Sequence, residues 1–185
     1  DEKGAYILNS RDMCMIDHVG ELMDAGLSSL KIEGRAKSAY YAAIVTGAYR
    51  HVIDDVAAGR AVDPVWRDEG EHVSHRHYST GFYPGQYTEN ARYIREWQVV
   101  ALVTDCTPDG MATLSLRNKF TAGDTLELVG PDTKPMTFTA PVMEDEAGEP
   151  LTEPKNPQMV FRMRLPRQVP AWTILRAARD LSAKS

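Results

Sequence analysis

Residues 27–38 read Leu-Ser-Ser-Leu-Lys-Ile-Glu-Gly-Arg-Ala-Lys-Ser, and this stretch decides the fold expected for the first half of the chain. Residues 27–33 are a compact strand candidate that stops at Gly34, because glycine lets the backbone turn without a Cβ clash. Ser38 is suited to cap a following helix, since its hydroxyl can accept a hydrogen bond from a free N–H of the first turn. The stretch therefore predicts a strand, a tight loop and a helix.

The same order of elements surrounds this stretch. Tyr6 to Leu8 is a short apolar strand candidate, and apolar residues then recur at helical spacing from Met13 until Gly26. The helix after Ser38 should end at Gly59. Its apolar face consists of Tyr41, Ala42, Val45, Tyr49, Val52, Ile53 and Val56. Two strand–helix units are too few to close a barrel or to cover both faces of a parallel sheet, so further α/β units are expected upstream of residues 1–60.

From Tyr93 onward the pattern changes to short strands separated by turns. The run Thr107-Pro108-Asp109-Gly110 is a strong turn, and prolines lie between strands, where a missing donor is tolerated. The strand candidates are residues 99–104, 111–116, 125–129, 136–140, 159–165 and 174–177. We predict a small antiparallel β-barrel over residues 92–179, a connecting segment at 61–91 and a tail at 180–185. The expected fold class is α+β.

Composition excludes several classes of protein. Of the 185 residues, 43% are hydrophobic and 25% are charged, which is typical of a globular protein. No apolar run approaches the roughly 20 residues of a membrane helix, so no membrane partner is expected. Two distant cysteines, Cys14 and Cys106, make neither a disulfide framework nor a zinc site, and they favour a cytoplasmic setting. The net charge of −5 and the lack of a strongly basic domain give no sign of nucleic-acid binding.

The most distinctive candidate site is Glu33, Arg35 and Lys37. If residues 27–33 are a parallel strand, these side chains lie at its C-terminal edge, where α/β barrels build their substrate sites. A carboxylate beside a guanidinium can bind an anionic substrate or keep a base ionised. A structural ion pair that anchors the following helix explains the same spacing. We treat the three residues as a candidate active-site edge.

Other chemistry finds less support. His72, His75 and His77 lie near Glu69 and Glu71, and imidazole suits zinc and iron, but the spacing matches no ligand motif, so no metal site is predicted. The sequence has no Gly-x-Ser-x-Gly elbow, no His-Glu-x-x-His and no phosphate-binding glycine motif.

Three arginines in the β region are candidate contacts for RNA or for a partner protein. Arg162 and Arg164 share one face of a predicted strand, and Arg167 follows closely. Guanidinium groups in this arrangement could contact RNA phosphates. A solvated strand face explains the alternation equally well.

Several motifs together resemble the C-terminal part of peptidase family U32, the collagenase-like proteases. The motifs are Asn9-Ser10-Arg11-Asp12-Met13-Cys14, Ser29-Leu30-Lys31-Ile32-Glu33-Gly34-Arg35, Lys37-Ser38, Tyr41, Ala48-Tyr49-Arg50, Ser74-His75-Arg76, Tyr78, Thr80-Gly81-Phe82-Tyr83 and Arg117-Asn118-Lys119-Phe120. The resemblance implies a TIM-like (β/α) barrel, of which residues 1–60 are the last βα units, followed by a small β-barrel domain. It also places the family's cysteine-rich signature and its iron–sulfur ligands in the upstream barrel. Cys14 and Cys106 do not match those positions, so no cofactor is expected in this chain.

The family name says peptidase, whereas better-understood relatives resemble enzymes that hydroxylate a tRNA wobble uridine or a ribosomal RNA cytidine. The resemblance therefore predicts the C-terminal part of an iron–sulfur-dependent RNA hydroxylation enzyme acting on tRNA or rRNA, inactive as this chain alone. The alternative is a non-catalytic β-barrel module that binds RNA or protein. Expected partners are the upstream barrel, tRNA or rRNA, and a second copy of the chain bound through exposed apolar α/β surface.

Overall fold

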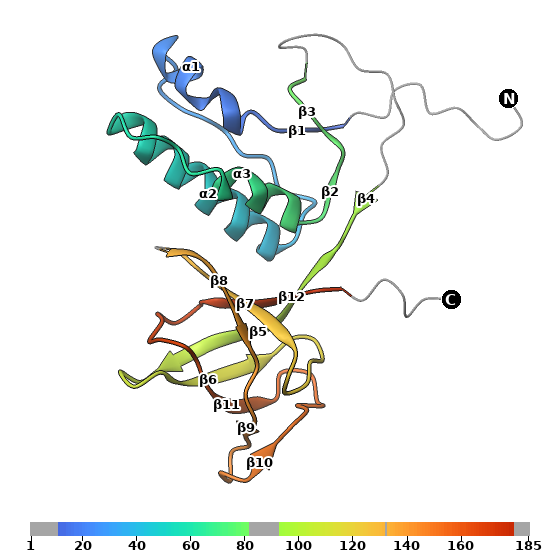
Figure 1. The fold of residues 1–185 in the computed structure, drawn as a ribbon. Coiled ribbons are helices and arrows are strands. Elements are labelled where there is room, and N and C mark those ends of the chain that lie inside the picture. The colour runs from blue at the N-terminus through green and yellow to red at the C-terminus, as the bar shows by residue number, and fades with distance from the viewer. Residues whose placement is uncertain (1–10, 82–92, 132, 180–185) are drawn as a thin grey trace, which may run out of the picture. The chain divides into compact units, whose positions relative to one another are not determined.

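A computed structural model describes residues 11–81, 93–131 and 133–179 of the chain (Figure 1). The chain divides into two compact units, Asp1–Glu96 and Trp97–Ser185. The strand predicted at Tyr6 to Leu8 lies outside the described residues. In the part that is described, no helix combines the length and the apolar character needed to cross a bilayer.

The first unit is mainly helical. Its helices are η1 (Ile16–His18), α1 (Val19–Asp24), α2 (Ala39–Ala57), α3 (Val65–Asp68) and η2 (Glu69–His72). Four two-residue strands accompany them: β1 (Asp12–Met13) pairs in parallel with β3 (Tyr78–Ser79), and β2 (His75–Arg76) pairs antiparallel with β4 (Tyr93–Ile94). The buried core of this unit is formed by Ile16, Val19, Ala48, Val52 and Trp66.

The two predicted helices are confirmed. The Ser38 hydroxyl accepts a hydrogen bond from the Tyr41 N–H at 3.1 Å and so caps α2. Gly59 adopts φ +65° just after the end of α2, a backbone conformation that glycine reaches without steric cost. Gly26 does the same after α1, with φ +83°. Met13, expected at the start of the first helix, instead lies in β1.

The strand predicted at residues 27–33 is wrong for this chain. These residues have no regular secondary structure, and Leu27, Leu30 and Ile32 are exposed. A strand is stabilised by ladder hydrogen bonds to a neighbour, and none of the described strands pairs with this segment. Apolar composition alone therefore does not make a strand here.

The second unit is an antiparallel β-sheet. Its strands are β5 (Trp97–Cys106), β6 (Met111–Leu116), β7 (Thr125–Gly130), β8 (Thr133–Thr139), β9 (Met143–Glu144), β10 (Pro150–Leu151), β11 (Val160–Arg164) and β12 (Ile174–Ala178). They form one sheet in the order β10-β9-β11-β6-β5-β12-β7-β8, and every pairing is antiparallel. Each strand predicted in this unit is present, β6 with the predicted bounds and the others with shifted ends, which confirms the mixed α+β content.

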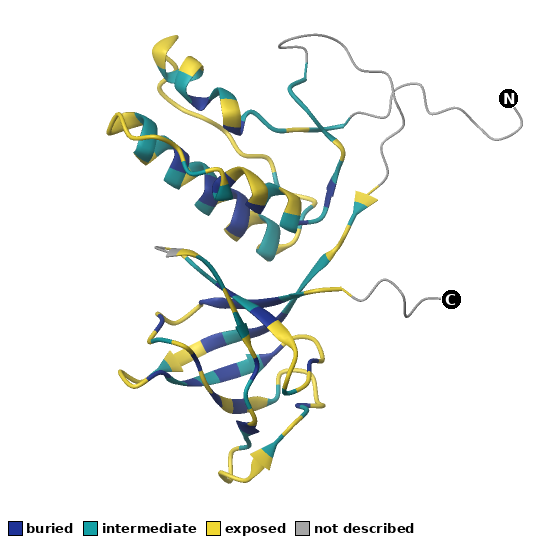
Figure 2. Cartoon of the chain, viewed as in Figure 1, coloured by how far each residue is buried: buried dark blue, intermediate teal, exposed yellow. Residues whose placement is uncertain are grey.

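Local sequence explains this sheet well. The turn predicted between β5 and β6 forms, with the Gly110 N–H donating to the Thr107 carbonyl at 2.9 Å. Along β11, Phe161 and Met163 are buried while Arg162 and Arg164 are exposed, the alternation of a strand with one face on a core. Figure 2 shows buried residues gathered on the strands of this unit and exposed residues in its loops.

Candidate functional site

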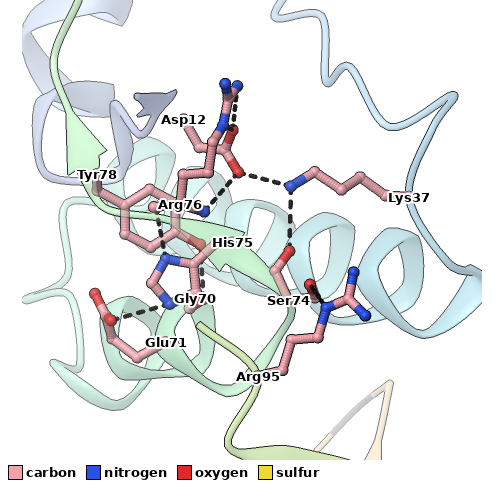
Figure 3. Close-up of polar contacts among 9 residues, drawn as sticks. All are labelled: Asp12, Lys37, Gly70, Glu71, Ser74, His75, Arg76, Tyr78 and Arg95. Atoms are coloured by element: carbon pink, nitrogen blue, oxygen red, sulfur yellow. Dashed lines mark hydrogen bonds and ion pairs between the residues drawn. The ribbon is translucent and has the colours of Figure 1, made fainter. Parts of the chain in front are cut away.

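A cluster of charged side chains in the first unit is built around Asp12. The carboxylate accepts from Lys37 Nζ at 2.6 Å, from the Arg76 backbone N–H at 3.1 Å and from Arg76 Nε at 2.9 Å (Figure 3). Its side chain is only 11% exposed and that of Lys37 only 15%. The three residues come from β1, from the loop before α2 and from β2. We call this group the Asp12 cluster.

The environment of Asp12 favours its charged form. Burial by itself would raise the pKa of this carboxyl, but the hydrogen bonds from Lys37 and Arg76 outweigh it and hold the pKa below its ordinary value. Two cations contact a single carboxylate, so the Asp12 cluster carries a net positive charge. Lys37 Nζ also donates to the Ser74 carbonyl at 3.1 Å, which ties the loop before α2 to the segment that leads into β2.

A second group of contacts surrounds His75, whose side chain is almost completely buried. The imidazole stacks on the Tyr78 ring with 4.3 Å between centroids, and Nδ1 lies 2.8 Å from the Arg76 carbonyl oxygen. Because a carbonyl oxygen only accepts, Nδ1 is the donor in this bond. Nε2 lies 3.2 Å from Glu71 Oε2, but the geometry is not that of a hydrogen bond. The two groups therefore interact only electrostatically. The packing fixes the ring firmly.

Two half-buried tyrosines, Tyr49 and Tyr78, lie in this part of the unit. The Tyr78 hydroxyl donates to the Gly70 carbonyl at 2.7 Å, and the Tyr49 hydroxyl accepts from the Met15 N–H at 2.9 Å. Burial raises the pKa of both phenols well above the ordinary value. Both are therefore neutral hydrogen-bonding groups at neutral pH and not bases.

A polar pocket of about 250 Å³ opens beside Tyr78. The Thr80 Oγ1 is buried and has no hydrogen-bond partner among the described residues. The pocket wall also includes an ion pair in which Arg67 Nε lies 3.2 Å from Asp17 Oδ2. The lining residues are Arg11, Cys14, Asp17, Arg67, Glu71, Tyr78, Ser79 and Thr80. The pocket can hold a small polar group, with charges of both signs on its wall.

The structure places the three residues of the predicted active-site edge in two different environments. Lys37 joins the Asp12 cluster, whereas Glu33 and Arg35 are exposed. Glu33 Oε1 accepts from the Arg35 backbone N–H at 2.9 Å, so it orders the turn and does not pair with the guanidinium. Sequence reasoning missed Asp12 and Arg76 as site residues. The available signal was that both stand in motifs of the family resemblance, Asn9-Ser10-Arg11-Asp12-Met13-Cys14 and Ser74-His75-Arg76.

The candidate arginines of the β unit are mostly engaged by acidic neighbours. Arg162 forms an ion pair with Glu144 at 3.1 Å, and Arg164 contacts the Asp109 carboxylate at 3.0 Å and its carbonyl at 2.7 Å. Hydrogen bonds from Thr107 and Arg164 hold the pKa of Asp109 below its ordinary value. Arg167 is half-buried.

The donor atoms of this chain do not fit an iron–sulfur cluster. Such clusters are held mainly by four cysteine thiolates, and the chain has only two cysteines, one in each unit. Four histidines, His18, His51, His72 and His75, have other contacts, such as His72 Nδ1 with Glu69 Oε1 at 3.0 Å. Within residues 11–81, 93–131 and 133–179, no three His, Cys, Asp or Glu residues gather closely enough to hold a metal ion.

A helical unit with a carboxylate–cation cluster, followed by an antiparallel β unit, defines a two-domain α+β protein. Its halves match two models of one family: residues 1–92 match "Peptidase family U32" and residues 95–176 match "Peptidase family U32 C-terminal domain". The chain belongs to peptidase family U32, which confirms the predicted resemblance.

Named relatives fall into two groups. The chain is 39% identical over 160 residues to tRNA hydroxylation protein P of Escherichia coli, and 29% identical over 180 residues to tRNA hydroxylation protein P1 of Bacillus subtilis. These alignments include 80% and 91% of this chain but only 34% and 42% of the relatives. A collagenase of Porphyromonas gingivalis is 32% identical over 94 residues, which are 46% of this chain and 22% of that protein. The chain thus spans less than half the length of these relatives.

Proposed function

We propose that this chain is the C-terminal part of a cytoplasmic enzyme that hydroxylates a nucleotide of tRNA or rRNA, with an iron–sulfur cluster held by residues outside this chain. The observation that carries the proposal is the 39% identity over 160 residues to a protein named for tRNA hydroxylation. The match to the collagenase is shorter, and the sequence has no Gly-x-Ser-x-Gly or His-Glu-x-x-His motif for peptide hydrolysis.

In this proposal the first unit is the end of a (β/α) barrel and the second closes into a small β-barrel. Support for the first part comes from residues 27–33, whose backbone has no ladder partner among the described strands and whose apolar side chains are exposed. Pairing with the remainder of a barrel would satisfy both features. The missing barrel of the same protein is therefore the proposed partner of this surface.

The chemistry assigned to this chain is binding and orientation. Hydroxylation replaces a C–H bond by C–OH and so requires an oxygen donor and an oxidant. The side chains of the described site are acids, cations and neutral phenols, which suit the binding of an anionic substrate. Glu33 and Arg35 are exposed in the loop before α2, and the Asp12 cluster holds that loop through Lys37.

The proposal is tested by comparing the full-length protein, purified without air, with this 185-residue chain. We expect iron, sulfide and visible absorbance in the long form only. We also expect only the long form to add an oxygen atom to a nucleoside of tRNA or rRNA, detected by mass spectrometry of digested RNA. Cleavage of a labelled peptide by the long form, without any RNA hydroxylation, would contradict the proposal.

Glu33→Ala and Arg35→Ala in the full-length protein should each lower RNA hydroxylation at least tenfold, because a positioning contact to the substrate is lost. The fold should be kept, since both side chains are exposed and Glu33→Ala removes only one exposed hydrogen bond, to the Arg35 N–H. Circular dichroism checks the fold. Arg60→Ala removes another exposed guanidinium from the same unit and is the matched control, expected to keep its activity. Wild-type activity in both edge variants would remove these residues from the site.

The alternative of a non-catalytic binding module in the β unit receives less support. Phosphate contacts would have to displace Glu144 from Arg162 and Asp109 from Arg164, since both guanidinium groups already contact carboxylates. We therefore favour the enzyme and give the β unit a supporting role in substrate placement.

A further inference from the structure

One aromatic ring of the first unit lies among cations and is largely exposed. Tyr93 on β4 is 54% exposed, and β2–β4 pairing places it opposite Arg76. The ring centroid lies 4.9 Å from Lys37 Nζ, 5.9 Å from Arg76 Cζ and 5.6 Å from Arg95 Cζ. We call these four residues the Tyr93 surface.

The Tyr93 surface carries an excess of positive charge. Lys37 and Arg76 share the single carboxylate of Asp12, while Arg95 is exposed and forms no ion pair with a carboxylate in the described part of the chain. Three cations against one carboxylate leave two positive charges. Arg95 Nε donates to the Ser74 hydroxyl at 3.0 Å, which holds the guanidinium in place with donors to spare (Figure 3).

An exposed aromatic ring next to fixed cations is the chemistry that recognises single-stranded nucleic acid. A base stacks on the ring and its phosphate contacts the guanidinium groups. An acidic peptide would use the cations but would gain little from the ring. We propose that the Tyr93 surface binds one unpaired nucleotide of an RNA, with the base against Tyr93 and a phosphate at Arg95. This inference rests on the proposed RNA substrate and adds a place where this chain contacts it.

The test measures binding of the chain to a fluorescently labelled single-stranded RNA oligonucleotide by anisotropy. Tyr93→Leu should weaken binding roughly 5- to 150-fold, the loss that follows from removing one base–aromatic stack of about 1–3 kcal/mol. Tyr93→Phe keeps the ring and is the matched control, expected to bind like the wild type. Arg95→Gln should weaken binding and reduce the slope of log K against log salt by about 0.7. Circular dichroism should show the same fold in all variants.

Three results would overturn the inference. The first is equal affinity of Tyr93→Leu and the wild type. The second is a wild-type chain that binds no RNA at low salt. The third is an acidic peptide, such as polyglutamate, that binds with a dependence on Arg95 but not on Tyr93, since the partner would then be a protein. RNA hydroxylation by the full-length protein remains a separate measurement, so a failure here is distinguishable from a failure of the proposed function.

Discussion

Asp12→Ala is expected to lower the free energy of unfolding of the first unit by about 3–5 kcal/mol, the cost of removing one partner from a buried ion pair. The variant leaves Lys37 and Arg76, both largely shielded from water, close to each other without the carboxylate between them. It also removes the acceptor of the Arg76 N–H. Hydrogen exchange read by mass spectrometry should show lost protection in α2 and unchanged protection in β5 and β6.

Asp12→Asn is the matched variant, because it keeps the shape of the side chain and removes the charge. Asp12 has a folded-state pKa below its unfolded value, so its contribution is fully present above the unfolded pKa and is lost as the pH falls through the folded pKa. The stability difference between wild type and Asp12→Asn should therefore shrink on acidification below about pH 4, the ordinary range for this group. A difference that is constant with pH would show that the charge of Asp12 does not contribute.

Elements set by local sequence were predictable from the residues alone. The hydroxyl of Ser38, the glycines after α1 and α2, and the turn at residues 107–110 each act within a few positions of the chain. Strand alternation in the β unit is also local, as Phe161 and Arg162 show. These features depend on backbone geometry that a short window of sequence determines.

The Asp12 cluster could not be predicted in the same way. Asp12 meets Lys37 across 25 positions and Arg76 across 64, so the contacts depend on how β1, β2 and α2 pack together. The sequence points to Lys37 because it lies near Glu33 and Arg35 along the chain, yet its contacts are with Asp12 and Ser74. The strand prediction for residues 27–33 failed for a related reason, because a strand also requires a pairing partner that composition cannot supply.

The second large effect is expected in the β unit, at the pair of Glu127 on β7 and Arg176 on β12. These residues are direct cross-strand neighbours, and Glu127 Oε2 accepts from Arg176 Nε at 2.9 Å and from Nη2 at 2.7 Å. The Arg176 side chain is fully buried, with its guanidinium carbon 4.9 Å from the centroid of the Trp97 ring. The Glu127 carboxylate thus supplies two charge-assisted hydrogen bonds to this buried guanidinium, and the aromatic face adds a weaker cation–π contact.

Glu127→Ala should therefore lower the free energy of unfolding of the β unit by about 3–5 kcal/mol, because the buried guanidinium loses both hydrogen bonds to the Glu127 carboxylate while the desolvation cost stays. The double variant Glu127→Leu with Arg176→Met removes both charges at similar volume and should come within about 1 kcal/mol of the wild type, since an apolar pair carries no desolvation penalty. Urea unfolding gives both values, and hydrogen exchange at β7 and β12 assigns them to this unit. A Glu127→Ala variant as stable as the wild type would mean that the remaining contacts of the Arg176 guanidinium already satisfy it. A double variant as unstable as Glu127→Ala would mean that the packing of the two side chains, and not their charge, stabilises the sheet at this point.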